Sequence, residues 1–586
     1  MTYEVQRDTI GRRPAWIVEI DLDYCSRVYG TSPCAAAIGT TGPAKCFNTR
    51  KTCQDSANYN RETKTYRFSN VLLPASGDVA FQAVPCIKDV SMLPSRIEPG
   101  KGIGKRAVMT VRLVDFTLSD LGIDKYLADR SYDSEARGTF FTKLMARNPY
   151  YQGRVLRVKT GYLIDGEEPD AANFETRAYR IERIDGPDRS GMVTIIAKDP
   201  LKALDDKRSQ APPPTTGVLS AALNSSDGNF SLTPAGIGNE KYPASGRLRI
   251  DDEVMSFSRT ADAFTVSRGT NFTTAVEHDD AAPAQLCLSY TAVNVVDILE
   301  ELLTTYAGLD AADLDLAGWS EEGSTWLSEY SLTAVISEPM GVGKLVAEIC
   351  EQCQLFIWWD ERAQLVKLKA VRPWAFDEVA EVNDTDNVLA KSQSVRDRPE
   401  DRVSQVQVYY GQKDPTADLD KPWNFQRLRV NIDSDAEGPD EYGDARISVI
   451  YSRWLSASQV ALAVKLASRQ LQRYRNNPRT ITFRLDAKDS AAWTGDTILA
   501  TIRTLTDYTG LALPSYLQVI EVRETVVGTE YEYVLEDTQF TGRYCLWAPE
   551  GIPDYPDSTD PQRGRYGWYS DNAGELSTTA DGYLYA

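Results

Sequence analysis

Histidine is almost absent from this sequence: His278 is the only one in 586 residues. Histidine is the most common general base and a frequent metal ligand, so catalysis by a Ser–His or Cys–His pair is not expected. No apolar run approaches the roughly 20 residues that a membrane-spanning helix needs. Residues 1–10 are polar and charged, which is not the pattern of a signal peptide. We therefore expect no stable membrane insertion by this chain.

Positive charge is scarce as well. The chain has 64 Lys and Arg against 84 Asp and Glu, a net charge of −20. A protein that grips nucleic acid neutralises phosphates with Lys and Arg, so tight binding to DNA is not expected. An acidic surface repels DNA, and the composition is compatible with a wall past which DNA moves without sticking.

The chain is rich in residues that are typical of β structure. It contains 30 Tyr, 11 Trp, 38 Gly and 29 Pro, and 42% of its residues are hydrophobic. Aromatic residues favour strands, and Gly and Pro mark turns. A chain of this length holds about three to five domains. The composition predicts a multidomain, mainly β protein with α+β parts.

Four of the nine cysteines crowd one short segment, at Cys25, Cys34, Cys46 and Cys53. The sequence around them is polar and turn-rich, with too few apolar side chains to hold its shape by a core alone. Four thiolates at one centre fit a metal or iron–sulfur site, which would supply the missing folding free energy. Structural zinc sites usually contain two ligands about two to four residues apart. This set has no such pair, and zinc stays an alternative, as do two disulfides or unrelated free thiols.

Alternation of apolar and polar residues predicts strands along most of the chain. Prolines at 212–214 mark a boundary, after which a small β unit follows with strands at 246–258 and 263–267. Apolar periodicity predicts helices at 292–306, 343–353 and 456–474. The other predicted strands span 12–24, 64–72, 107–116, 153–163, 178–184, 192–197, 354–359, 364–370, 402–410, 480–485, 496–502, 517–522 and 530–535.

Several weaker motifs favour structural interpretations. Residues 100–105 (GKGIGK) and 340–344 (MGVGK) lack the Ser or Thr that follows the lysine of a phosphate-binding loop; the first is expected to be a loop and the second a helix start. Cys350 and Cys353 lie on an apolar helix face, which favours packed thiols over a redox pair. Residues 251–253 (DDE) are expected in a solvated turn. No set of nucleophile, base and orienting residue emerges, and the chain is not expected to be an enzyme.

The cysteine segment, which ends in CFNTRKTCQD at residues 46–55, resembles the cluster of tail-tip proteins of long-tailed phages, including the lambda-type minor tail protein L. Residues 93–116, 138–163 and 197–206 resemble tail-hub proteins of Mu-like phages and gene-transfer agents. Residues 246–278 resemble the small β insertions of such hubs. Residues 291–545 resemble the later barrel and α/β domains of a T4-type baseplate hub.

The resemblance implies a structural hub that closes the tail tube and adapts its sixfold rings to a threefold tip. It implies a 4Fe–4S cluster as cofactor, bound by Cys25, Cys34, Cys46 and Cys53. The implied partners are two further copies in a homotrimer, the distal tail protein ring, central fibre or tip proteins, and the tape-measure protein, with DNA only in passage. The implied location is the virion tail tip, assembled in the cytoplasm of the bacterial host. An iron–sulfur enzyme of electron transfer or radical chemistry, and a receptor- or glycan-binding tail protein, are the alternatives.

Pattern and resemblance together predict six parts of the chain. Residues 548–586 are poor in apolar mass but carry regularly spaced tyrosines, so this segment is expected to dock on a neighbouring subunit or tip protein. The six parts are strands with the iron–sulfur excursion (1–95), a first β-barrel hub domain (96–210), a small inserted β domain (211–290), an α/β hub domain (291–395), a second β-barrel hub domain with a long helix (396–547), and the extended C-terminal docking segment (548–586).

Overall fold

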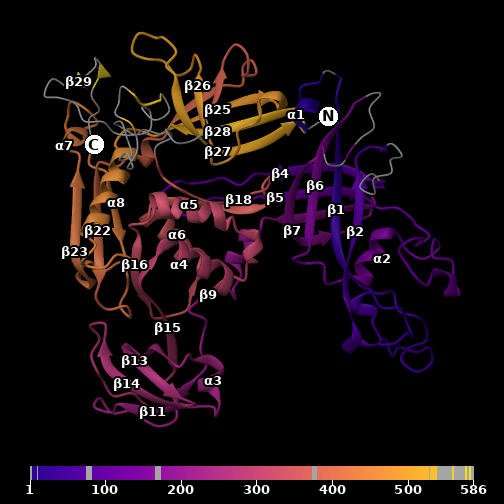
Figure 1. Ribbon diagram of the computed structural model, residues 1–586, viewed down its shortest axis with the longest axis horizontal. Coiled ribbons are helices and arrows are strands. Elements are labelled where there is room, and N and C mark those ends of the chain that lie inside the picture. The colour runs from indigo at the N-terminus through magenta and orange to yellow at the C-terminus, as the bar shows by residue number, and fades with distance from the viewer. Residues whose placement is uncertain are drawn as a thin grey trace.

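The computed structural model describes residues 3–9, 11–73, 82–164, 170, 173–372, 379–526, 528–537, 553, 557–559, 575–576 and 580–581. Within them the chain is mainly β, with sheets of eight, seven and six strands and only short helices. This confirms the predicted fold class. Figure 1 shows the N-terminal sheet on the right, the six-stranded sheet at the top, the inserted β unit at the lower left and the helices between them.

The N-terminal sheet closes into a barrel, called barrel 1. Its strand order is β3-β2-β1-β6-β7-β8-β5-β4. The two end strands of this order, β3 and β4, are separated in the chain only by Cys86, and they pair with β2 and β5 respectively. The expected boundary at residue 95 therefore falls inside one barrel. The strands are β1 (Arg13–Cys25), β2 (Arg61–Ser69), β3 (Val84–Pro85), β4 (Ile87–Leu93), β5 (Val108–Val114), β6 (Val155–Leu163), β7 (Glu175–Asp185) and β8 (Met192–Lys198).

Alternation along the strands fills this barrel. On β5, Met109, Val111 and Leu113 are buried while the residues between them are not. Helix α2 (Phe140–Arg147), which the sequence patterns did not predict, buries Phe140 and Phe141 against the same core.

The outer face of barrel 1 carries an ionic ladder. Glu19 on the central strand β1 pairs with Arg67 on β2 and Arg157 on β6, both at 3.0 Å. Burial opposes the charge of Glu19, but the neighbouring cations outweigh it and hold the pKa of this carboxyl below its usual value. Asp21 and Asp23 continue the row: Asp21 shares Arg157 with Glu19, and Asp23 pairs with Arg61. Most cations of this face are thus engaged by carboxylates of the same barrel.

The small inserted domain forms most of a seven-stranded sheet in the order β10-β11-β14-β13-β12-β15-β16, whose last strand, β16, comes from beyond residue 290. The predicted single strand over 246–258 is wrong: it is a hairpin, because Asp251 adopts φ 48° and turns the chain. The elements are β10 (Val218–Leu219), β11 (Asn229–Thr233), α3 (Ile237–Lys241), β12 (Ser245–Ile250), β13 (Glu253–Thr260), β14 (Ala263–Thr270), β15 (Ala284–Asn294) and β16 (Ser331–Ile336).

The only histidine of the sequence lies in this domain and is buried. His278 places Nδ1 2.7 Å from Asp251 and Nε2 3.0 Å from Glu253. Glu253 is fully buried and also accepts from Arg268 at 2.7 and 2.8 Å. The expectation of a solvated turn at 251–253 is therefore wrong for Glu253, because the long-range partners Arg268 and His278 satisfy its charge.

A helical core lies beside barrel 1 and is called the α/β core. Helix α6 (Val342–Gln352) buries Leu345, Val346 and Ile349, and both Cys350 and Cys353 lie in the same core. The other elements are β9 (Gln210–Ala211), α4 (Val295–Glu301) with a π turn over 302–306, α5 (Leu316–Trp326), β17 (Met340–Gly341), β18 (Leu355–Asp360) and β19 (Leu365–Ala370).

The predicted unit over 396–547 divides into two sheets. A three-stranded sheet, β23-β22-β24, packs one face against helix α8 (Val460–Tyr474) and joins the α/β core. Its strands are β22 (Gln405–Gln412), β23 (Phe425–Ile432) and β24 (Ile447–Tyr451), and the short helix α7 (Ser434–Glu437) follows β23.

The second sheet closes into barrel 2, in the order β20-β26-β27-β28-β25-β21. Closure follows because β20 pairs with β26, while Val388 and β21, a few residues further on, pair with β25. The strands are β20 (Ala380–Asn383), β21 (Ser394–Asp397), β25 (Arg479–Asp486), β26 (Thr497–Thr501), β27 (Ser515–Val526) and β28 (Glu530–Asp537).

A buried ionic network joins the two barrels and the α/β core. Arg177 on β7 donates to Glu524 on β27 at 2.8 Å and to Glu175 at 3.1 Å. Glu175 also pairs with Arg362 from the turn between β18 and β19. Burial alone would raise the pKa of Glu175, but the two guanidinium groups hold it below its usual value.

Glu361 in the same turn gives a testable pH dependence. Its side chain is buried, one carboxyl oxygen has no hydrogen-bond partner among the described residues, and burial raises its pKa to about 7. Because the folded pKa lies above the unfolded one, the protonated form stabilises the fold below about pH 4.5, and that contribution is lost as pH rises through about 7. We expect Glu361→Gln to raise the unfolding free energy at pH 8 by about 1–3 kcal/mol and to flatten its pH dependence.

Urea unfolding at pH 5 and pH 8 measures this effect. Glu240→Gln, at an exposed carboxylate, is the control and should leave the pH dependence unchanged. Equal stability of Glu361→Gln and the unmodified protein at both pH values would contradict the prediction.

Candidate metal centre

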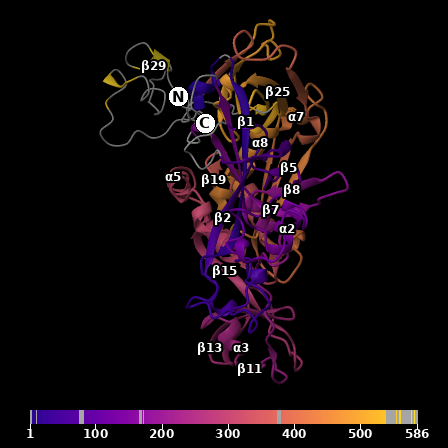
Figure 2. The same ribbon diagram turned by 90° about the vertical axis from the view of Figure 1, so that its right-hand side faces the viewer.

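The cysteine segment is an excursion of barrel 1 between β1 and β2. Strand β1 ends at Cys25, and the chain returns as β2 at Arg61. This agrees with the predicted position of the four cysteines between two strands. Figures 1 and 2 place the indigo excursion and the inserted domain at the same end of the molecule.

Asn48 holds the first turn of the excursion. The backbone N–H of Cys25 donates to the Asn48 carbonyl at 2.6 Å. The Asn48 side chain donates back to the carbonyls of Cys25 and Arg27, at 3.3 and 3.1 Å. Asn48 adopts φ 54°, a left-handed conformation that Asn accepts more readily than most residues.

Asp55 ties the second and fourth cysteines together. Its carboxylate accepts from the backbone N–H of Ala35, next to Cys34, at 2.7 Å, and from the Asn58 amide at 3.0 Å. Asp55 lies two residues after Cys53, so one side chain links two loops that the chain order separates.

These contacts bring the four predicted ligands together. Cys25, Cys34, Cys46 and Cys53 line one small cavity. None of them forms a disulfide with another described cysteine. In the part of the chain that the structure describes, no three or more Cys, His, Asp or Glu side chains are arranged to hold a single metal ion.

The sulfurs are close enough to influence one another. Burial raises the pKa of the Cys46 thiol, and the other three cysteines of the cavity add to the increase. Burial also raises the pKa of Cys53. Backbone N–H groups of Asn48 and Asp55 oppose these increases by hydrogen bonding to the two sulfurs. N–H groups aimed at sulfur stabilise the thiolate form, the form that binds metals.

A loop of barrel 1 supports the excursion from outside. Arg130 donates to the carbonyls of Lys45 and Cys46, at 2.6 and 2.9 Å, and its guanidinium lies 3.9 Å from the centre of the Phe47 ring. Tyr126 accepts from the backbone N–H of Tyr29 at 2.7 Å. Sequence reasoning missed Arg130 and Tyr126, since they lie more than 70 residues from the cluster in the chain and no local pattern marks them.

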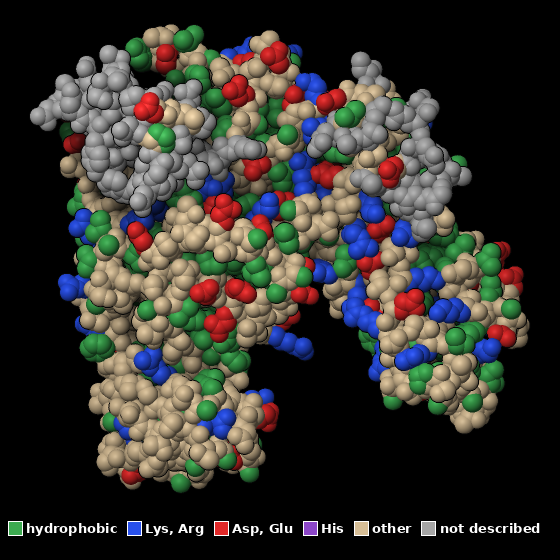
Figure 3. All heavy atoms as spheres, viewed as in Figure 1, with side chains coloured by type: hydrophobic (Ala, Val, Ile, Leu, Met, Phe, Trp, Pro, Cys, Tyr) green, Lys and Arg blue, Asp and Glu red, His purple; other side chains and the backbone are tan. Residues whose placement is uncertain are grey.

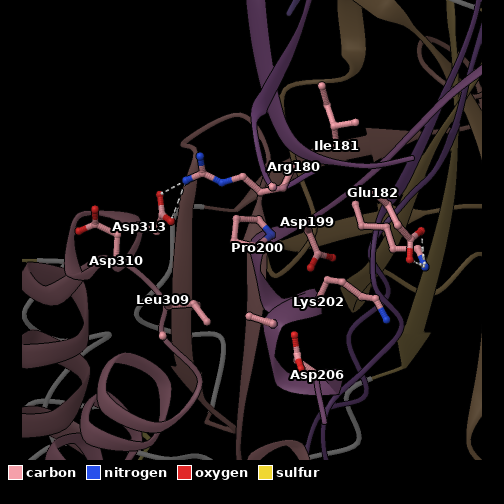
Figure 4. A pocket seen from close by; sticks show the side chains of 14 residues that line it. Arg180, Ile181, Glu182, Asp199, Pro200, Lys202, Asp206, Leu309, Asp310 and Asp313 are labelled. Atoms are coloured by element: carbon pink, nitrogen blue, oxygen red, sulfur yellow. Dashed lines mark hydrogen bonds and ion pairs between the residues drawn. The ribbon is translucent and has the colours of Figure 1, made fainter. Parts of the chain in front are cut away.

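A larger cavity, of about 530 Å³, lies between barrel 1 and the loop before α5. Figure 4 shows that charged side chains line it, and four of them form two ion pairs: Arg180 with Asp313 at 3.0 Å and Lys198 with Glu182 at 2.8 Å. Burial raises the pKa of Asp199 to about 6. No Ser, Cys or His is among its described lining residues, so the cavity offers no nucleophile of those types.

The two glycine-rich candidates have structural roles. Residues 100–105 form a turn in which Gly104 lies against the backbone of Arg96. A Cβ atom at position 104 would overlap that backbone. Arg96 and Lys105 are joined there by two backbone hydrogen bonds, of 2.9 and 3.1 Å. Helix α6 begins at Val342, within residues 340–344. Both outcomes agree with the sequence-based expectation.

The fold and site define a multidomain β protein with two closed barrels and a four-cysteine cavity. No family model and no curated protein matches the sequence. Among the described residues, no helix is long and apolar enough to cross a membrane.

Solved structures with a similar arrangement include tail proteins. The 43 kDa tail protein of prophage MuSo2 from Shewanella oneidensis has 10% identity and a TM-score of 0.35, with 76% of this chain and 93% of that chain covered. A tail protein from Neisseria meningitidis MC58 has 11% identity and a TM-score of 0.36, with 76% and 91% covered. A Francisella PdpA–VgrG complex has 8% identity and a TM-score of 0.33, with 93% and 62% covered. Similarity at this level carries no argument about function.

Proposed function

We propose that this chain is a structural hub protein of a phage tail tip. The proposal rests on one observation: Cys25, Cys34, Cys46 and Cys53 line the same cavity. Their segment resembles that of tail-tip proteins, and this resemblance implies that the four cysteines lie together. The two closed barrels with an α/β core between them fit the hub architecture implied by the rest of the chain.

In this proposal three copies close the tail tube below the distal tail protein ring and above the central tip or fibre proteins. The tape-measure protein and then DNA pass through the assembly. Figure 3 shows Lys and Arg gathered over barrel 1 and mixed with Asp and Glu elsewhere on the visible face, and the net charge of the chain is −20. The overall excess of acidic residues opposes stable binding of passing phosphates.

We also propose a 4Fe–4S cluster on the four cysteines. The donor set of four thiols fits, because cysteine sulfur is the ligand that holds 4Fe–4S clusters. The cluster would hold together a segment that is poor in apolar side chains.

Deletion of the gene in a phage that encodes this chain tests the hub role. We expect filled heads but no complete tails, because a tail tube does not polymerise without its tip complex. Electron microscopy of lysates provides the measurement. Complementation with the intact chain should restore tails; full-length tails without the chain would overturn the proposal.

A further inference from the structure

A second cavity lies beside the cysteine excursion, and three arginines line it. Arg50 comes from the excursion, Arg147 from the end of α2 and Arg154 from the loop before β6. We call it the arginine cavity. Its volume is about 370 Å³, within the range of roughly 300–1,000 Å³ that small-molecule sites occupy. None of its described lining residues belongs to the four-cysteine cavity, so the two cavities are separate sites.

Asp23, which also lines the arginine cavity, does not cancel the positive charge beside it. It forms ion pairs with Arg154 and, at 2.7 Å, with Arg61. One carboxylate is thus shared between two guanidinium groups, and the three side chains together keep one excess positive charge. Because arginine stays protonated at any physiological pH, this charge is permanent.

Arg147 is held in a similar way. Asp120 pairs with Arg147 at 2.7 Å and with Lys143 at 2.8 Å. Burial opposes the charge of Asp120, but hydrogen bonds from these two cations hold the pKa of its carboxyl below the usual value. The Arg147 guanidinium also lies 4.2 Å from the centre of the Phe47 ring in the excursion, which is next to α2 in Figure 1. These contacts fix Arg147 before a ligand arrives, and this group too keeps one excess positive charge.

Arg50 carries the third positive charge, and no carboxylate of the described residues forms an ion pair with it. Its Nη1 donates to the carbonyl of Ser56 at 2.7 Å, and its guanidinium lies 5.4 Å from the centre of the Tyr59 ring. Arg50 is exposed, so its remaining N–H groups can bind a ligand. The planar fork of a guanidinium matches the oxygens of a phosphate group, to which it can donate two parallel hydrogen bonds.

The rest of the lining suits an organic group. Leu22, Tyr59 and Tyr150 add apolar and aromatic surface to the cavity, and Tyr150 is 59% exposed. A tyrosine offers a flat apolar face and a polar hydroxyl to a ligand, at low entropic cost. A ligand that combines an anionic group with a small polar ring would therefore use both parts of the cavity.

We propose that the arginine cavity binds a phosphate monoester on a small polar ring, of the size of a sugar phosphate. Three excess positive charges match a phosphate group, which carries about −1.5 to −2 at pH 7, better than they match a single carboxylate. The phosphate binds to the three arginines and the ring packs on Tyr150. The proposal is independent of the hub role and of the predicted docking segment 548–586, most of which lies outside the described residues.

Isothermal titration calorimetry of the full-length chain in phosphate-free buffer tests the proposal with glucose 6-phosphate, inorganic phosphate and glucose as probes. We expect glucose 6-phosphate to bind at least about tenfold more tightly than inorganic phosphate, and glucose not to bind. Arg50→Gln should weaken the binding of glucose 6-phosphate at least about tenfold, because it removes a charge-assisted contact. Tyr150→Ala should weaken the binding of glucose 6-phosphate and leave that of inorganic phosphate unchanged.

The matched control is Arg112→Gln on β5, at another arginine of barrel 1 whose side chain is 57% exposed; it should leave the affinities unchanged. Circular dichroism and melting curves verify that each variant folds. Three results would each overturn the proposal: no saturable binding of glucose 6-phosphate, equal affinity for glucose 6-phosphate and inorganic phosphate, or an unchanged affinity in Arg50→Gln. Tail assembly is measured separately in the deletion experiment, so the loss of this site would leave the hub role standing.

Discussion

Replacement of Cys46 by Ser is expected to abolish the iron content of the protein and to loosen the excursion between β1 and β2. Cys46 lines the four-cysteine cavity, and its sulfur accepts from the Asn48 backbone N–H. A 4Fe–4S cluster requires four thiolates, so loss of one should lower the iron from about four atoms per chain towards zero. Iron and sulfide analysis of protein purified without oxygen gives the measurement.

Loss of the cluster should also be visible as proteolysis. The excursion contains Lys45, Arg50 and Lys51, and it has few apolar side chains to hold it once the metal is gone. We expect trypsin to cut it early in the Cys46→Ser variant and slowly in the unmodified protein. Cys86→Ser is the control, because Cys86 lies between β3 and β4 and outside the cavity. Zinc in place of iron, or no metal at all, would reject the cluster.

Replacement of Arg177 by Met is expected to cost about 3–5 kcal/mol of stability, because it leaves buried carboxylates without their partner. Arg177 is 2% exposed and donates to both Glu524 and Glu175. Chemical denaturation followed by tryptophan fluorescence measures the loss. Trp493, whose ring lies 5.3 Å from the Arg177 guanidinium, reports on this junction.

A second substitution separates the lost charge from lost packing. The double variant Arg177→Met with Glu524→Gln should recover part of the stability, since it removes one stranded charge. Arg183→Met is the control on the same strand: its partner Asp185 and Arg183 itself are both more than half exposed, so we expect a change below about 0.5 kcal/mol. A similar cost for Arg177 and Arg183 would show that the buried network does not hold the barrels together.

Strand positions were predictable where the pattern is local. Residues 107–116 alternate between apolar and polar side chains, and β5 is found at Val108–Val114. Helix α2 escaped prediction, because its eight residues are too few to establish a helical period and its burial depends on contacts with β2 and Phe116. The hairpin over 246–258 was missed since the positive φ of Asp251 interrupts an alternation that otherwise continues through the turn.

Closure of the barrels could not be predicted from sequence. Each closure depends on a short chain segment that pairs with one strand at its start and with a distant strand at its end, as residues 84–93 pair with β2 and β5. The domain boundary predicted at residue 95 is therefore wrong, because this pairing places residues on both sides of it in one barrel. The expected barrel over 396–547 likewise combined two sheets, because only the packing of α8 assigns β22 to the α/β core.

The sequence by itself determined the β-rich class, the excess of acidic charge and the choice of four cysteines as a set, because these depend on composition and short spacing. Only the tertiary structure decided which residues surround the four cysteines. Arg130 and Tyr126 reach the cysteine loops from a separate loop of barrel 1, and Arg177 meets Glu524 across 347 residues of chain. The exposure of Leu428 and Ile432 on β23 is also a tertiary property, since the side of a strand that stays uncovered depends on where α8 packs. Contacts between distant segments are set by the whole fold, and no local pattern encodes them.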